Sequence, residues 1–80
     1  MHIILGIKCC NRENDAPKIQ QILTDYGCFI DMRLGLHHFG NCSADGIILT
    51  AFNNEEKALE AEKKILSLGN TEVQKMKFKM

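Results

Sequence analysis

Residues 3–9 read Ile-Ile-Leu-Gly-Ile-Lys-Cys, an apolar run of strand length, and a helix-start signature follows it directly. Asn14 or Asp15 is a good N-cap, and Pro17 fits the first helical turn, where its missing N–H costs nothing. Apolar residues then recur at helical spacing as one stripe, and Gly27 stands where a left-handed C-cap is expected. The stripe comprises Ile19, Ile22, Leu23 and Tyr26. The first third of the chain therefore predicts a strand followed by an amphipathic helix.

The remainder repeats this unit after an additional strand. Residues 28–38 alternate between apolar and polar positions, which is typical of a strand with one buried face, and Ile47–Phe52 forms a further apolar run. Asn53 or Asn54 caps a second helix that ends at Gly69, and Thr71–Phe78 gives a last strand. The order βαββαβ predicts an α+β fold, the ferredoxin-like plait. It has a four-stranded antiparallel sheet in the order 4-1-3-2 with both helices on one face.

Length and charge limit the function. Eighty residues make one domain, which we take to span 1–80, and ten basic residues balance ten acidic ones. Independent DNA or RNA binding is not expected, because phosphate neutralisation normally requires a clearly basic domain. No apolar run is long enough to span a bilayer and no signal peptide is recognisable, so we expect a cytoplasmic protein with reduced cysteines.

The richest stretch in potential metal ligands runs from Arg33 to Gly46 and contains His37, His38 and Cys42. Consecutive strand residues point to opposite faces, so His37 and His38 cannot both bind one ion. His37 shares the polar face of its strand with Arg33 and is the better ligand, with Cys42 returning across the turn. Two ligands are too few for a closed site, so a divalent transition metal of the nickel or zinc type would need ligands from a second copy, either its own His37 and Cys42 or its Asp31.

The second predicted strand lies at an edge of the sheet, and an edge of this length with few charges favours pairing with another copy. The sheet face away from the helices is expected to carry apolar side chains among Ile4, Phe29, Ile47 and Leu49. Both features predict a homodimer. No catalytic motif is recognisable, so we do not expect an enzyme.

Several short motifs resemble those of the small stand-alone ACT-like proteins described as regulators of the iron-only hydrogenase system. They include Asn11-Arg12-Glu13 after the first strand, Tyr26-Gly27 at the end of the first helix, and Arg33-Leu34-Gly35-Leu36 in the second strand. The resemblance implies a dimeric, non-catalytic regulator or sensor with an ACT-like fold. It also implies that Asn11, Arg12 and Glu13 contribute to binding a small-molecule effector.

A second resemblance supports the metal alternative. His37 and Cys42 are similar in placement to the metal ligands of the C-terminal domain of the nickel-responsive repressor. One residue fewer separates the two here, and the His-x-His alternation is missing. Three functions are therefore open: a regulatory ligand sensor connected with hydrogenase or redox metabolism, a metal-binding homodimer, and a protein–protein interaction module.

Overall fold

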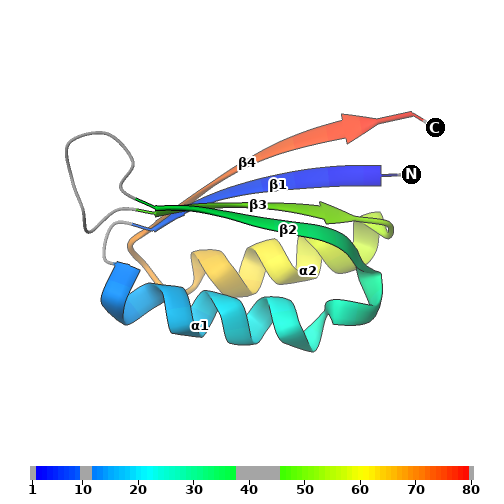
Figure 1. Ribbon diagram of the computed structural model, residues 1–80. Coiled ribbons are helices and arrows are strands. Elements are labelled where there is room, and N and C mark those ends of the chain that lie inside the picture. Colours follow the sequence, from blue (N-terminus) through cyan, green and yellow to red (C-terminus); the bar gives the residue numbers. More distant parts are fainter. Residues whose placement is uncertain (1, 10–11, 38–45, 80) are drawn as a thin grey trace.

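The computed structural model describes residues 2–9, 12–37 and 46–79. The chain forms β1 (His2–Cys9), α1 (Arg12–Asp25), a 3-10 turn at Gly27–Phe29, β2 (Ile30–His37), β3 (Gly46–Phe52), α2 (Glu55–Leu66) and β4 (Thr71–Phe78). The four strands form one sheet in the order β2-β3-β1-β4, with every neighbouring pair antiparallel. Both helices lie on the same face of this sheet (Figure 1). The predicted α+β ferredoxin-like plait and its strand order are confirmed.

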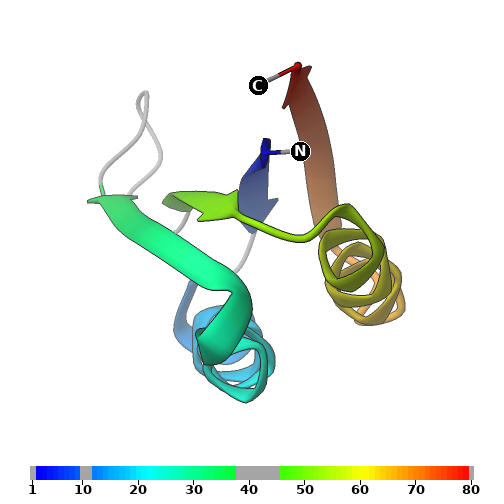
Figure 2. The ribbon, with the colours of Figure 1, turned by 90° about the vertical axis from the view of Figure 1, so that its right-hand side faces the viewer.

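Strand alternation divides the sheet into a covered and an open face (Figure 2). On β1, residues 3, 5, 7 and 9 are buried beneath the helices, and the residues between them are only partly buried. Phe52 of β3 and Ile19 and Leu23 of α1 complete the centre of the core, all with no exposed surface. The helices therefore protect one side of the sheet and leave the other side to solvent.

The second helix follows its sequence signals closely. The Asn54 side chain accepts a hydrogen bond from the Lys57 backbone N–H at 3.0 Å, which confirms an asparagine N-cap. Ala58, Ala61 and Ile65 form its buried face. Gly69 has a φ of 102°, a backbone conformation that glycine adopts without strain, and it turns the chain towards β4.

The first helix differs from its predicted boundaries at both ends. It begins at Arg12, so Pro17 lies in its second turn instead of its first. Arg12 and Glu13 are good helix formers and extend the helix upstream of the expected cap. At the other end, the Phe29 N–H donates to the Tyr26 carbonyl at 2.9 Å in a 3-10 turn, so Gly27 is not the left-handed cap that we predicted.

This turn also changes the predicted start of the second strand. Cys28, the first residue of the strand predicted over 28–38, is exposed in the 3-10 turn, and β2 begins only at Ile30. Phe29, expected near the open face, packs instead against the core. The turn rotates the chain before β2 begins, so the alternation could not be extended back to residue 28.

The outermost strands are tied to the helices by polar contacts. Arg33 of β2 donates to Gln20 and Thr24 of α1, so the polar side of β2 is the one that faces the helices. On β4, Lys75 pairs with Glu62 of α2 at 3.0 Å, and Lys77 pairs with Glu55. In the described part of the chain, no helix is both long and apolar enough to cross a membrane.

Candidate functional site

The predicted site residues converge on one end of the sheet. Across the strands, His37 of β2 lies opposite Gly46 of β3, Gly46 lies opposite Cys9 of β1, and Cys9 lies opposite Thr71 of β4. Arg12 begins α1 three residues after Cys9, the last residue of β1, at this same end of the sheet. The topology therefore brings the backbone of Arg12 and Glu13 and that of His37 to the same end of the sheet.

The structure does not describe the side chains of the predicted effector and metal-binding residues. Asn11 and Cys42 lie outside the described residues, and Arg12, Glu13 and His37 are described only by their backbone. Among the side chains that the structure does describe, no group of three or more His, Cys, Asp or Glu could hold a metal ion. The effector residues Asn11, Arg12 and Glu13 and the metal ligands His37 and Cys42 thus stay predictions.

Asp31, the further ligand considered for a second copy, lies at the opposite end of β2 from His37. A β-bulge falls between Ile30 and Met32 at this point. The Asp31 carboxylate accepts a hydrogen bond from Asn53 at 2.9 Å and lies 3.5 Å from the His2 imidazole. Within one chain, Asp31 therefore belongs to a polar group at the start of β2 and not to the His37 end.

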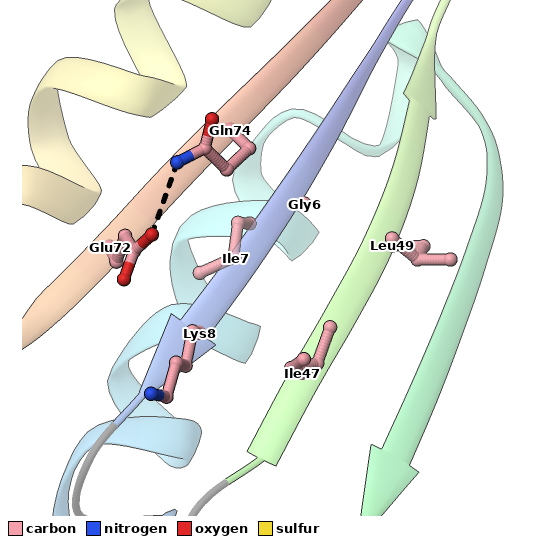
Figure 3. A pocket seen from close by; sticks show the side chains of 7 residues that line it. All are labelled: Gly6, Ile7, Lys8, Ile47, Leu49, Glu72 and Gln74. Atoms are coloured by element: carbon pink, nitrogen blue, oxygen red, sulfur yellow. Dashed lines mark hydrogen bonds between the residues drawn. The ribbon is translucent and has the colours of Figure 1, made fainter. Parts of the chain in front are cut away.

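The open face carries a hollow of about 390 Å³ above Gly6 of β1 (Figure 3). Gly6 lies opposite Leu49 of β3 and opposite Gln74 of β4. A Cβ atom built at Gly6 would lie 3.5 Å from the Leu49 side chain and 3.8 Å from the Gln74 carbonyl oxygen. The hollow exists because the central strand has no side chain at the position where its neighbours do.

The two sides of the hollow differ in chemistry. Ile47 and Leu49 of β3 form an apolar wall, whereas Lys8 of β1 and the β4 residues Glu72 and Gln74 form a polar one (Figure 3). The Gln74 amide donates to the Glu72 carboxylate at 3.1 Å. Lys8 lies opposite Glu72 in the strand register, yet its ammonium is within ion-pair distance of no carboxylate among the described residues.

Apolar side chains surround the hollow along the open face. Ile4, Ile47, Leu49 and Ala51 are partly buried there, and four larger side chains are more than two-fifths exposed. These four are Met32, Leu34, Met76 and Phe78. The prediction that Ile4, Ile47 and Leu49 lie on this face is consistent with the register, but the hollow itself was not predicted. The available signal was Gly6 inside an apolar strand, since such a glycine often marks a place where another group approaches.

Comparison with known proteins defines the fold but no family. The sequence matches no family model and no curated protein. The structure is similar to that of an uncharacterized protein from Thermotoga maritima, with a TM-score of 0.83 and 18% identity, over 98% of this chain and 96% of that one. The likeness therefore extends over nearly the whole of both chains.

Two larger proteins contain a similar unit. They are formyltetrahydrofolate deformylases from Burkholderia mallei (TM-score 0.69) and Pseudomonas putida (TM-score 0.62), each 10% identical. The match covers 96% and 98% of this chain but only 28% and 29% of theirs. The chain thus has the ferredoxin-like fold, which these comparisons find both over nearly the full length of another chain and as a part of longer chains.

Proposed function

We propose that this chain is a non-catalytic, ligand-sensing regulatory domain of ACT-like fold whose effector binds in the hollow above Gly6. The observation that carries the proposal is the two-sided lining of this hollow. An apolar wall with a few converging polar groups is the usual composition of a small-molecule site, and 390 Å³ lies within the usual size range.

The lining favours a small organic anion with an apolar body. The Lys8 ammonium offers the charge for an anionic group, while Ile47 and Leu49 offer contact to the apolar part. Glu72 and Gln74 add oxygen acceptors on β4 that suit a hydroxyl or N–H donor of the ligand. These groups bind and orient the ligand. Binding raises the stability of the folded domain, and the domain signals through this change.

A thermal-shift screen of aliphatic and aromatic carboxylates tests this function. We expect at least one compound to raise the melting temperature of the wild-type protein. Lys8→Met should abolish the shift, because it removes the ammonium at the hollow, whereas Lys63→Met on the exposed side of α2 should preserve it. Equal shifts in both variants, or no shift with any compound, would contradict an effector site in this hollow.

A steric variant adds an independent check. Gly6→Val places methyl groups inside the hollow, where the space above Gly6 can accept a Cβ atom at ordinary contact distance. Gly35→Val on β2 is the matched control, since nothing lies within 4 Å of a Cβ atom built there. The first variant should lose effector binding and keep its fold by circular dichroism, and the second should keep both.

The predicted effector residues Asn11, Arg12 and Glu13 are a further part of this proposal. They follow β1 at the end of the sheet to which Lys8 belongs, so a longer ligand could extend from the hollow towards them. Arg12→Ala should then weaken the binding of ligands with two anionic groups more than the binding of ligands with one. Equal weakening of both would assign Arg12 no role in binding.

The connection with hydrogenase or redox metabolism is supported by the motif resemblance alone. We propose it as the system in which the domain acts. Joint transcription with hydrogenase genes and altered hydrogenase activity after deletion of the gene are the expected findings. Unchanged hydrogenase expression and activity in the deletion strain would argue against this connection.

Metal binding by His37 and Cys42 is the second candidate function. In its favour, His37 ends β2 directly before the segment that contains Cys42, and Gly46 of β3 lies opposite it. Protein purified without a histidine tag should contain a stoichiometric transition metal. His37→Ala and Cys42→Ser should lose it, and Cys28→Ser, at an exposed position beyond the other end of β2, should retain it. No metal in the wild type, or equal metal in all variants, would exclude this function.

A further inference from the structure

The open face of the sheet is an apolar surface that the helices of its own chain do not cover. Met32 and Leu34 of β2 are 42% and 48% exposed, and Met76 and Phe78 of β4 are 55% and 46% exposed. Ile4, Ile47, Leu49 and Ala51 join these two edges through the central strands. An apolar surface that extends across four strands usually marks an interaction site.

The size of this face suits a second sheet. Four strands spaced about 4.8 Å apart and about eight residues long at 3.3 Å per residue cover roughly 500 Å² of flat area. Two such faces in contact would bury on the order of 1,000 Å² in total, the lower bound for a specific interface. Stacked sheets pack about 10 Å apart with their side chains interdigitating, so side chains of both copies add to this area.

The polar groups of this face lie at its two ends. His2 lies beside Asp31 at one end, and Lys8 lies opposite the oppositely charged Glu72 at the other. The apolar middle separates the two pairs. Because these groups lie at the two ends, the apolar middle can meet another copy of itself without bringing like charges together there, and a polar rim around an apolar centre is the usual anatomy of an interface.

We propose that two copies of the chain pack open face to open face about a two-fold axis parallel to the strands, between the central strands β1 and β3. Such an axis places β3 of each copy over β1 of the other. Gly6 and Leu49 are opposite each other in the register of one chain, so the axis brings Leu49 of each copy over the Gly6 hollow of the second copy. The same axis places Met32 of β2 over Met76 of β4 in the second copy, because both lie opposite the pair Ile4 and Ala51.

The pairing completes the hollow. On one chain the hollow is open to solvent, whereas small-molecule sites usually bury 70–90% or more of their ligand. Leu49 of the second copy supplies the missing cover, so each dimer has two enclosed chambers. This last step rests on the proposed function, since it identifies the chamber with the effector site, and it predicts that effector binding strengthens the dimer.

Light scattering over a range of protein concentrations tests the interface. The wild type should have the mass of two chains at about 100 µM, and Leu34→Lys should have the mass of one, because it places a charge on the apolar face. Leu66→Lys is the matched control, since Leu66 is 46% exposed on α2, away from the open face. A wild-type protein with the mass of one chain, or equal masses for both variants, would overturn the proposal.

Cysteine cross-linking tests the orientation. In one chain, Met32 and Met76 lie on the two edge strands, three strand spacings or about 14 Å apart. Facing residues of two stacked sheets lie about 10 Å apart, beyond the span of a disulfide, so a bismaleimide of matching length is the cross-linker. A treated mixture of Met32→Cys and Met76→Cys proteins should give a covalent dimer of one copy of each, and treated wild type controls for the native cysteines. Cross-linking of Met32→Cys protein to itself alone would instead indicate pairing through the β2 edge and would overturn the face-to-face arrangement.

The two proposals can fail separately. A dimer that cross-links as expected but responds to no carboxylate would support the proposed interface and contradict the proposed effector site. A carboxylate that binds through Lys8 to a protein with the mass of one chain would support the proposed effector site and overturn the proposed dimer. An effector that binds without changing the dimer dissociation constant would overturn the enclosed chamber.

Discussion

The two faces of the sheet contain apolar residues in similar measure, but the chain covers only one of them. On β1, Ile3 and Leu5 are fully buried beneath the helices, whereas Ile4 between them is only partly buried on the open face. The two faces therefore differ in what covers them more than in what they contain. The covered face stabilises the fold of one chain, and we assign the open face to contacts with a ligand and a second copy.

The largest expected effect compares the same substitution on both faces. Leu5→Ala, at a position with no exposed surface, should lower the free energy of unfolding by about 2–5 kcal/mol through lost contacts and a cavity. Leu34→Ala on the open face, where the side chain is 48% exposed, should cost about 0.5 kcal/mol. Urea unfolding at a concentration too low for a dimer measures both values. Similar losses in the two variants would mean that the open face also stabilises the single chain.

A buried polar side chain on the covered face, Thr50, offers a substitution that should increase stability. Thr50 of β3 is fully buried, and its hydroxyl has no hydrogen-bond partner in the described structure. Thr50→Val should raise the free energy of unfolding by about 1 kcal/mol, because a buried unpaired hydroxyl is costly. Thr24→Val is the control, since the Thr24 hydroxyl donates to the Gln20 carbonyl at 2.8 Å on the exposed side of α1. A loss of stability in Thr50→Val would indicate a partner for this hydroxyl.

The N-terminus of α2, which helps to cover the buried face of the sheet, is capped by Asn54. Asn54→Ala removes the cap of α2 and should lower the free energy of unfolding by about 1 kcal/mol. Asn54→Asp keeps an oxygen acceptor at the cap and should preserve most of the stability. Thermal unfolding of the two variants measures the difference, and an unchanged Asn54→Ala protein would show that packing alone holds this end of α2.

The smallest effect concerns the polar ties between β4 and α2. Lys75→Met removes the ion pair with Glu62 and should change the free energy of unfolding by about 0.5 kcal/mol or less, because the lysine side chain is 41% exposed. High salt should reduce the difference further. A larger loss, unaffected by salt, would mean that the Lys75 methylene chain contributes to covering the core.

The sequence predicts the fold well where a local signal agrees with the packing. Asn54 caps the start of α2 and Gly69 follows its end, as expected. The alternation of buried and partly buried residues in β1 and β3 separates the two faces of the sheet. The boundaries of α1 were less predictable, because Gly27 could end the helix either as a left-handed cap or within a 3-10 turn. Tertiary packing of Phe29 against the core decides between the two.

The candidate site was predictable only in part. Alternation alone indicates that Ile47 and Leu49 share a face, but the hollow depends on Gly6 standing between Leu49 and Gln74 across three strands. Such a register is set by the packing of residues that are distant in the sequence. The metal and effector predictions at His37, Cys42, Asn11, Arg12 and Glu13 rest on local patterns, and the described residues do not test them.

The position of β1 at the centre of the sheet has a consequence for folding kinetics. Its partners are both distant in the sequence: Ile3 lies opposite Phe52 on one side and opposite Lys77 on the other. Contacts between such distant residues require the closure of long loops, and chains that depend on them fold more slowly than chains with local contacts. Until β4 docks, one side of β1 presents unpaired backbone groups between apolar side chains, the kind of edge at which chains associate. We therefore expect slow refolding in which aggregation competes with the arrival of the last strand.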